Sequence, residues 1–316
     1  MRRRSRNSTI SRRTPYTFQT PGLHMPEQVQ VLQRYYPSPQ YLLPADEKEA
    51  IRLDAQHLII VKAFENRLSL APLTLTAGDK VLESAAGSGI WALEFAALNI
   101  VNGAAVDIEC IDISSRQFPS IHPAHIHFSV QSVANLPYEW TNTFAYAHQR
   151  LIVLAMNASL WRSAISEMYR VLRPGGWLEL VEFETERFHC GVGPSSNKLC
   201  SLVDKLFAEK GIIQDVSVYL CPLLEEVGFI DVQSETRDVP VGGRRVVEGG
   251  NGYTGEEWGE GWMGIKVPVV NGGGYGVVNT AEEFDGLLQN SVREWNNSKE
   301  VHTSFYTILA RKPPSS

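Results

Sequence analysis

The chain has 316 residues, 43% of them hydrophobic, and a formal net charge of −6, so it can bury a sizeable core. Its longest apolar runs, around 59–62 and 151–156, fall far short of the roughly 18 residues that a membrane helix requires, and we expect no membrane association. Six arginines and no acid precede Glu27, which leaves 23 basic against 35 acidic residues in the remainder and argues against a nucleic-acid partner.

Residues 1–26 are rich in Arg, Ser and Thr and lack the apolar segment of a secretory signal. A disordered basic tail is the favoured interpretation, and mitochondrial targeting is the alternative. Four cysteines without a C-x-x-C pair disfavour a zinc site or a dense disulfide framework. A reducing compartment fits best, so we expect a cytoplasmic protein, with a nuclear location left open.

The first predicted helix begins after Asp46, with Glu49 at the spacing of a capping box. Strands and helices then alternate, and the Pro-Gly-Gly sequence at 174–176 breaks the second core helix. This alternation predicts a doubly wound, largely parallel sheet. The expected elements are strands at about 80–84, 106–112, 125–130, 143–147 and 177–184, with one helix between Gly89 and Gly103 and another spanning Trp161 to Leu172.

The pattern changes from about residue 195. Two helices are expected, ended by Gly211 and Gly228, before a strand-like stretch at 229–241. Residues 242–276 are rich in glycine but contain aromatic side chains, which seek burial, so we expect an insertion that packs over another part of the fold. A helix at about 280–295 and a strand at 302–313 follow.

The stretch VLESAAGSGIW at 81–91 reads as a buried strand, a glycine-containing turn and the start of a helix. Ligands of doubly wound sheets bind at such turns, beyond the carboxyl ends of the strands. Gly87 and Gly89 let the backbone turn and approach a ligand closely, and Ala85 keeps the approach nearly as open. Glu83 would oppose the pyrophosphate of a dinucleotide but attract an ammonium group. The turn therefore favours S-adenosylmethionine over NAD.

Asp112 ends the second strand, where a carboxylate can accept hydrogen bonds from both hydroxyls of a ribose. Its spacing from Gly89 suits NAD as well as S-adenosylmethionine, so it discriminates only when paired with Glu83. Ile113 follows Asp112 directly. Ser132 and Val133 follow the third strand, where an adenine ring is expected.

Four motifs in this order resemble the class I methyltransferases: E-x-A-x-G-x-G at 83–89, the acid at 112, FAYAHQR at 144–150 and LRPGGW at 172–177. More narrowly, YLLPADEKEAIRLDAQH at 41–57, HQR at 148–150, GEEWGEGWMG and NGGGYGV are similar to the fungal LaeA-like (UMTA-type) branch. The resemblance covers about 41–313. It implies a Rossmann-like, seven-stranded α/β sheet whose last strand inserts antiparallel.

The sequence departs from that pattern at Ala85, where a first glycine is common, and at Ala145, where an aspartate is frequent. The first change should narrow the approach only by a methyl group, and the second removes a polar contact. The resemblance divides the chain into the tail at 1–26 and one methyltransferase domain at 27–316. That domain comprises a helical cap at 27–70, a cofactor-binding core at 71–190, and C-terminal helices, a glycine-rich insertion and final strands at 191–316.

In the resembling family the N-terminal helix folds across the cofactor, which implies contacts from Tyr41, Arg52 and His57, with the Arg52 guanidinium forking onto the cofactor carboxylate. His148, Gln149 and Arg150 follow the fourth strand, at the junction of cofactor and acceptor. His148 is a candidate general base, and packing of its ring against the cofactor is the favoured interpretation. The predicted cofactor-binding set is Tyr41, Arg52, His57, Glu83, Ala85, Gly87, Gly89, Asp112, Ile113, Ser132, Val133, His148 and Gln149.

Other polar and aromatic residues allow two readings each. Glu182 and Glu184, at the end of the fifth strand, could meet a cationic acceptor or be paired within the protein. The tryptophans and methionine of the insertion, Trp258, Trp262 and Met263, could roof an acceptor or fill the core, which we slightly favour. His125 and His127 share a strand face, but without an acidic or cysteine ligand nearby we expect no metal site.

These features predict an S-adenosylmethionine-dependent methyltransferase that modifies a small, aromatic or lipophilic metabolite, in secondary metabolism if the resemblance holds. Alignment supplies much of the acceleration of methyl transfer, so a base is optional. The alternative is a non-catalytic or regulatory protein of the same fold with a protein partner, because the resembling family includes members known chiefly as regulators. The acceptor atom and the oligomeric state stay open.

Overall fold

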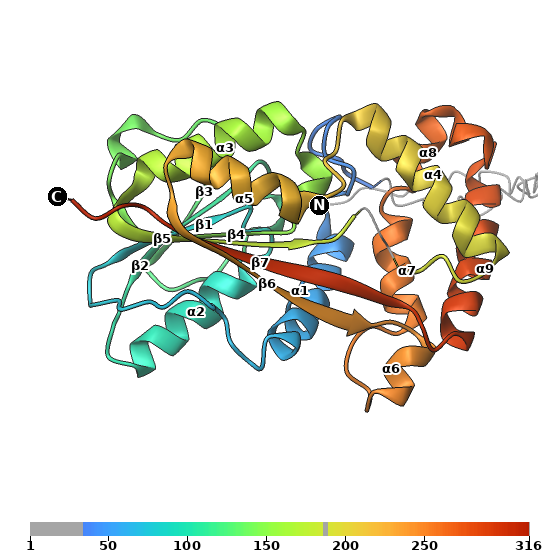
Figure 1. Cartoon of the computed structure of the whole chain (residues 1–316), viewed down its shortest axis with the longest axis horizontal. Coiled ribbons are helices and arrows are strands. Elements are labelled where there is room, and N and C mark those ends of the chain that lie inside the picture. The colour runs from blue at the N-terminus through green and yellow to red at the C-terminus, as the bar shows by residue number, and fades with distance from the viewer. Residues whose placement is uncertain (1–33, 186–188, 316) are drawn as a thin grey trace, which may run out of the picture. The chain divides into compact units, whose positions relative to one another are not determined.

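A seven-stranded sheet forms the centre of the computed structural model, which describes residues 34–185 and 189–315 (Figure 1). The strand order is β3-β2-β1-β4-β5-β7-β6. The predicted basic tail lies outside the described residues. The strands are β1 (Lys80–Ser84), β2 (Asp107–Asp112), β3 (Ile126–Val130), β4 (Phe144–Arg150), β5 (Leu172–Phe183), β6 (Ile230–Pro240) and β7 (His302–Arg311).

Five neighbouring strands, β3, β2, β1, β4 and β5, run parallel, and β7 lies antiparallel between β5 and β6. The prediction of a doubly wound sheet with an antiparallel final strand is therefore confirmed. The strand order reverses at β1 and β4, because β2 is added on one side of this pair and β5 on the other. The carboxyl ends of β1 and β4 thus border the crevice where ligands of such sheets bind.

Helices cover both faces of the sheet and continue as a group beyond one of its ends (Figure 1). The loops from β2 to β3 and from β3 to β4 carry short 3₁₀ turns, η1 (Ser115–Gln117) and η2 (Tyr138–Trp140). None of the described helices is long and apolar enough to cross a membrane. The α-helices are α1 (Glu47–Ala63), α2 (Ile90–Val101), α3 (Ala158–Val171), α4 (Pro194–Lys210), α5 (Val216–Val227), α6 (Gly243–Val247), α7 (Gly255–Met263), α8 (Lys266–Asn271) and α9 (Ala281–Asn297).

Helix α1 begins after Asp46, as predicted, and the Asp46 carboxylate accepts a hydrogen bond from the Glu49 backbone N–H at 3.1 Å. The Glu49 side chain does not complete the predicted capping box. It binds Arg52 at 2.6 Å and Arg34 at 3.4 Å instead, because two guanidinium groups outcompete a single backbone N–H for a carboxylate.

The Pro-Gly-Gly break lies inside β5 rather than before it. Helix α3 ends at Val171, and β5 begins at Leu172 with an irregular register against β4 between Phe144 and Tyr146. A Cβ atom at Gly176 would stand 3.1 Å from the carbonyl oxygens of Phe144 and Ala145. Glycine therefore permits the close approach of the two strands here.

The glycine-rich insertion forms α6, α7 and α8 and buries its aromatic side chains, as expected. The rings of Trp258 and Trp262 lie 6.2 Å apart, and Trp262 is 6.1 Å from Trp295 of α9. This cluster fixes α7 against α9, next to the crevice at the carboxyl ends of the strands.

Candidate functional site

The turn after β1 contains three residues in the left-handed backbone region: Ala85 at φ 56°, Gly87 at φ 54° and Gly89 at φ 76°. Ala85 therefore does more than narrow the approach by a methyl group, because a left-handed alanine carries about 1–2 kcal/mol of strain. At Gly89, the N-cap of α2, a Cβ atom would lie 2.6 Å from the Phe128 ring. Gly89 is thus required for packing under the turn, which is a different role from the ligand contact predicted for it.

A cavity of about 280 Å³ opens above this turn, at the carboxyl ends of β1, β2 and β4, and is covered by α1 and the segment before it. We call it the first cavity. Eight residues of the predicted cofactor-binding set line it: Tyr41, His57, Ala85, Gly87, Asp112, Ile113, Ser132 and Val133.

Asp112 forms one polar end of the first cavity. Its carboxylate accepts hydrogen bonds from the backbone N–H groups of Gly87, at 2.9 Å, and Ser114, at 3.1 Å. Burial raises the pKa of Asp112, and these two donors oppose the shift. The apolar side chains of Ile113 and Val133 line the same region. This end can accept hydrogen bonds from a pair of hydroxyls and hold a flat apolar ring beside them.

Arg150 lies at the other side of the first cavity, where β4 ends. Its Nη1 is 2.9 Å from Nδ1 of the buried His57, and Nε2 of His57 is 2.9 Å from a carboxylate oxygen of Glu94. Burial and the adjacent guanidinium lower the pKa of His57. The imidazole is therefore neutral, with Nε2–H donating to Glu94 and Nδ1 accepting from Arg150.

Glu83 lies beneath the cavity floor and is not among its lining residues. The side chain is 1% exposed, and one carboxylate oxygen lies 2.5 Å from Nδ1 of His148 on the adjacent strand. The Trp91 ring stacks on His148 with their centroids 3.9 Å apart. Burial raises the pKa of Glu83 well above its ordinary value and lowers that of His148 to about 3, so the two groups share one proton as a neutral pair.

This arrangement corrects two expectations. Glu83 cannot attract an ammonium group in the cavity, because its carboxyl is directed to His148 on the face of the sheet that α2 covers. His148 cannot serve as a base toward an acceptor, because its ring is enclosed between Glu83 and Trp91 and lines neither the first cavity nor the narrower cavity beside it.

Gln149 and Arg52 also lie away from the first cavity. Gln149 is fully buried and accepts a hydrogen bond from the Ser84 hydroxyl at 3.0 Å. Arg52 lines a neighbouring cavity, and its guanidinium donates to Glu49 and to Gln56. The geometry therefore does not favour the expected bidentate hydrogen bond from Arg52 to a cofactor carboxylate.

A second, narrower cavity of about 80 Å³ adjoins the first. The two share four lining residues: Tyr41, Leu53, Gln56 and Leu151. The wall of the second cavity is mainly apolar and aromatic, built from Phe183 of β5, Phe207 of α4 and the two tryptophans of α7. Trp258 and Trp262 thus belong both to the core and to the lining, although the sequence favoured the core.

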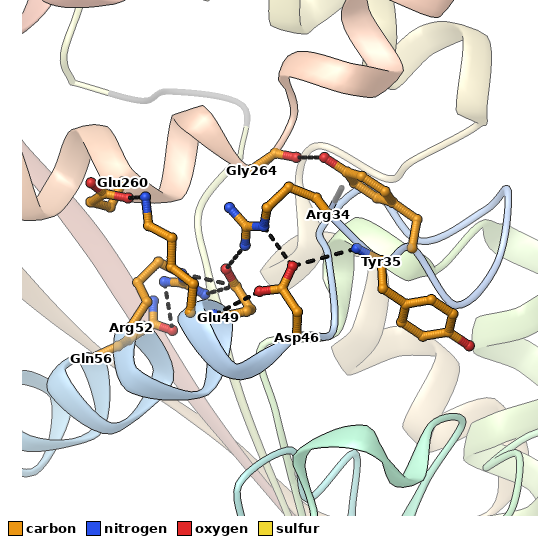
Figure 2. A network of polar contacts seen from close by, with 10 residues as sticks. Arg34, Tyr35, Asp46, Glu49, Arg52, Gln56, Glu260 and Gly264 are labelled. Atoms are coloured by element: carbon orange, nitrogen blue, oxygen red, sulfur yellow. Dashed lines mark hydrogen bonds and ion pairs between the residues drawn. The ribbon is translucent and has the colours of Figure 1, made fainter. Parts of the chain in front are cut away.

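A polar network holds α1 over the junction of the two cavities (Figure 2). Glu49, 2% exposed, lies between the guanidinium groups of Arg34 and Arg52, and Arg34 also binds Asp46 at 2.6 Å. The Tyr36 hydroxyl donates to the Gly264 carbonyl at 2.8 Å. These contacts join the segment before α1 to the helices of the insertion.

The acids at the end of β5 are paired within the protein. Glu182 accepts hydrogen bonds from the backbone N–H groups of Ile152, at 3.0 Å, and Val153, at 3.1 Å. Glu184 accepts one from the Tyr306 hydroxyl at 2.8 Å. Glu182 therefore supports the turn that carries Leu151 into the cavity wall, and neither acid lines the first or the second cavity.

The sequence placed Arg150 at the junction of cofactor and acceptor but not in the predicted cofactor-binding set, and it did not single out Gln56 or Leu151. Arg150 is the last residue of the HQR motif and lies at the end of a parallel strand. That position was the sequence signal that could have identified it as a ligand contact. Gln56 and Leu151 can be identified as ligand contacts only from the tertiary structure, in which α1 crosses the ends of the strands. Among the described residues, no group of three or more His, Cys, Asp or Glu side chains is placed to hold a metal ion.

A family model described as "Methyltransferase domain" matches residues 81–176. The chain is 31% identical to the N-methyltransferase sirN of Leptosphaeria maculans over 215 residues, covering 65% of this chain and 72% of that protein. It is 28% identical to the methyltransferase pytC of Aspergillus terreus over 301 residues, covering 88% and 85%. Phosphoethanolamine N-methyltransferase 2 of Haemonchus contortus, solved with S-adenosyl-L-methionine, aligns over 82% of this chain and 52% of that one with 14% identity. Its TM-score of 0.48 carries no weight for the assignment.

Proposed function

The chain belongs to the S-adenosylmethionine-dependent methyltransferases, and from that premise we propose that it methylates a neutral nitrogen on a small aromatic or lipophilic molecule held in the second cavity. The observation that carries this proposal is the junction of the two cavities at Tyr41, Leu53, Gln56 and Leu151. A cofactor in the first cavity and an acceptor in the second would meet there.

The residues of the first cavity fit S-adenosylmethionine, which supplies an electrophilic methyl group when bound. Asp112 can accept hydrogen bonds from the ribose hydroxyls, and Ile113 and Val133 can enclose the adenine ring. A Cβ atom at Gly87 would already lie 3.1 Å from the Leu53 side chain. A side chain at Gly87 would therefore press against Leu53, which lines both cavities.

The protein contributes alignment and exclusion of water to this reaction. The histidines nearest the site are both engaged within the protein: His57 accepts a hydrogen bond from Arg150, and His148 shares a proton with Glu83. Holding an acceptor lone pair in line with a reactive methyl group supplies a large part of the acceleration, because the enzyme removes the entropic cost of bringing the two together. Methyl transfer to a neutral amine gives an ammonium product, which can release its proton to water, so no side chain has to accept a proton during the transfer.

The second cavity favours a neutral acceptor, because the charged side chains at its edge are paired within the protein. Arg52 binds Glu49, and Glu257 accepts a hydrogen bond from the Thr254 backbone N–H at 2.7 Å. An apolar wall also lowers the pKa of an amine and so favours its nucleophilic form. The name of sirN as an N-methyltransferase supports nitrogen as the acceptor atom.

The test is a screen of fungal metabolite extracts and synthetic aromatic amines with methyl-labelled S-adenosylmethionine. We expect label on the nitrogen of one compound class, and none with the Asp112→Ala variant. Label on oxygen or carbon would contradict the nitrogen assignment. Cofactor binding without any labelled product, together with a biological output that survives in Asp112→Ala, would favour the regulatory alternative.

A further inference from the structure

Arg150 is a half-buried cation without a direct acidic partner among the described residues. Among the described residues, the only contact of its guanidinium at hydrogen-bond distance is Nδ1 of His57, a neutral acceptor. The two arginines of the adjacent network differ, because Arg34 and Arg52 each bind a carboxylate at 2.6 Å. Glu83, on the strand next to Arg150, is occupied by His148.

A guanidinium removed from water is stabilised when its remaining N–H groups meet an anion. Arg150 lines the first cavity, which is also lined by the glycine turn. The acid that lines that cavity, Asp112, lies on the far side of β1 and already accepts two backbone hydrogen bonds. The side of the cavity near Arg150 is therefore suited to an anionic group.

Asp112 and Arg150 are spaced to bind a ligand that has hydroxyl groups at one end and an anionic group at the other. Asp112 ends β2 and Arg150 ends β4, and β1 lies between those strands. Two strand spacings separate their backbones by about 10 Å. A nucleoside whose ribose hydroxyls meet Asp112 would bring an extended amino-acid substituent toward Arg150, and its sulfur would lie between them, near the junction with the second cavity.

We propose that Arg150 binds the carboxylate of the cofactor's amino-acid group and that His57, held by Glu94, positions the guanidinium for this contact. The inference rests on the proposed use of S-adenosylmethionine in the first cavity. His57 acts by accepting an N–H of Arg150, while its other nitrogen is fixed by Glu94. It is thus a positioning residue, and Arg150 is the binding residue.

The test compares two ligands by titration calorimetry: S-adenosylhomocysteine and its decarboxylated analogue, which keeps the amine and lacks only the carboxylate. The ratio of their dissociation constants measures what the carboxylate contributes. In the unmodified protein we expect S-adenosylhomocysteine to bind roughly tenfold to a hundredfold more tightly, the range of a charge-assisted contact. Arg150→Gln should bring the ratio close to one, mainly by weakening S-adenosylhomocysteine, and Arg150→Lys should retain part of it.

Arg52→Gln is the matched comparison, because it tests the competing arginine and should leave the ratio unchanged. His57→Leu should lower the ratio, and His57→Asn, which keeps an oxygen acceptor near the position of Nδ1, should retain more of it. Thermal unfolding of each variant confirms that folded protein is being titrated.

An unchanged ratio in Arg150→Gln, or an equal weakening of both ligands, would overturn the inference while leaving the proposed cofactor intact. A ratio abolished by Arg52→Gln instead would also overturn it and assign the contact to Arg52. Failure of the unmodified protein to bind either nucleoside would refute the proposed function, and the inference with it.

Discussion

Replacing Glu83 tests whether its carboxyl stabilises the protein interior or binds the cofactor. The carboxyl shares a proton with His148 at 2.5 Å, and Trp91 covers the pair. Glu83→Ala removes a buried partner and leaves both a void and an unpaired imidazole nitrogen. We expect a loss of about 3–5 kcal/mol in the free energy of unfolding, from the cavity and the lost hydrogen bond together.

Glu83→Gln should behave differently, because an amide N–H can donate to Nδ1 of His148 as a protonated carboxyl does. We expect it to cost less than about 1.5 kcal/mol, the net value of a neutral hydrogen bond. At about 2–4 °C per kcal/mol for a chain of this size, the alanine variant should melt roughly 6–20 °C below the parent and the glutamine variant within about 6 °C.

The assay is thermal unfolding combined with titration of S-adenosylhomocysteine at a temperature where all variants are folded. Both variants should bind it within about threefold of the parent protein, a difference of less than 1 kcal/mol. A loss of tenfold or more in Glu83→Gln, without a change in melting temperature, would show that the carboxylate reaches the cofactor. Equal destabilisation by glutamine and alanine would show instead that the pair is ionic.

Three further outcomes are expected. Asp112→Asn should weaken the binding of S-adenosylhomocysteine and of its decarboxylated analogue equally, by roughly tenfold to a hundredfold, whereas Arg150→Gln should weaken mainly the first. Titration calorimetry measures both losses of affinity. Unequal losses in Asp112→Asn would contradict the ribose contact. Trp262→Leu should raise the KM for the identified acceptor about tenfold or more through lost apolar contact, with cofactor affinity as the control; an unchanged KM would place the acceptor elsewhere. Burial raises the pKa of Glu182 to about 8, above its value in the unfolded chain, so its contribution to stability is complete below about pH 4.5 and is lost as the pH rises through 8. Denaturant unfolding from pH 5 to 9 should therefore show a decline of up to about 1.4 kcal/mol per pH unit that Glu182→Gln reduces, and an identical slope in that variant would refute the shift.

The sequence by itself determined the order and type of most elements, because these depend on interactions between near neighbours in the chain. Asp46 marks the start of α1, and Gly211 and Gly228 end their helices in the left-handed conformation, which is a local requirement of the backbone. The strand, glycine turn and helix at 81–91 were readable for the same reason. The antiparallel final strand came from the family resemblance rather than from any local pattern.

Only the tertiary structure decided where the polar side chains of the site are directed. Glu83 is two residues from Val81 and therefore shares its sheet face, which α2 covers with Trp91. The pairing of β1 with β4 then places His148 beside Glu83, and α1 brings His57 against Arg150. Residues separated by more than 60 positions meet in these contacts, and nothing in the local sequence specifies the partner. Burial then converts an acid that suggests a cation site into half of a neutral pair, and leaves the half-buried Arg150 as the cation that lines the cavity.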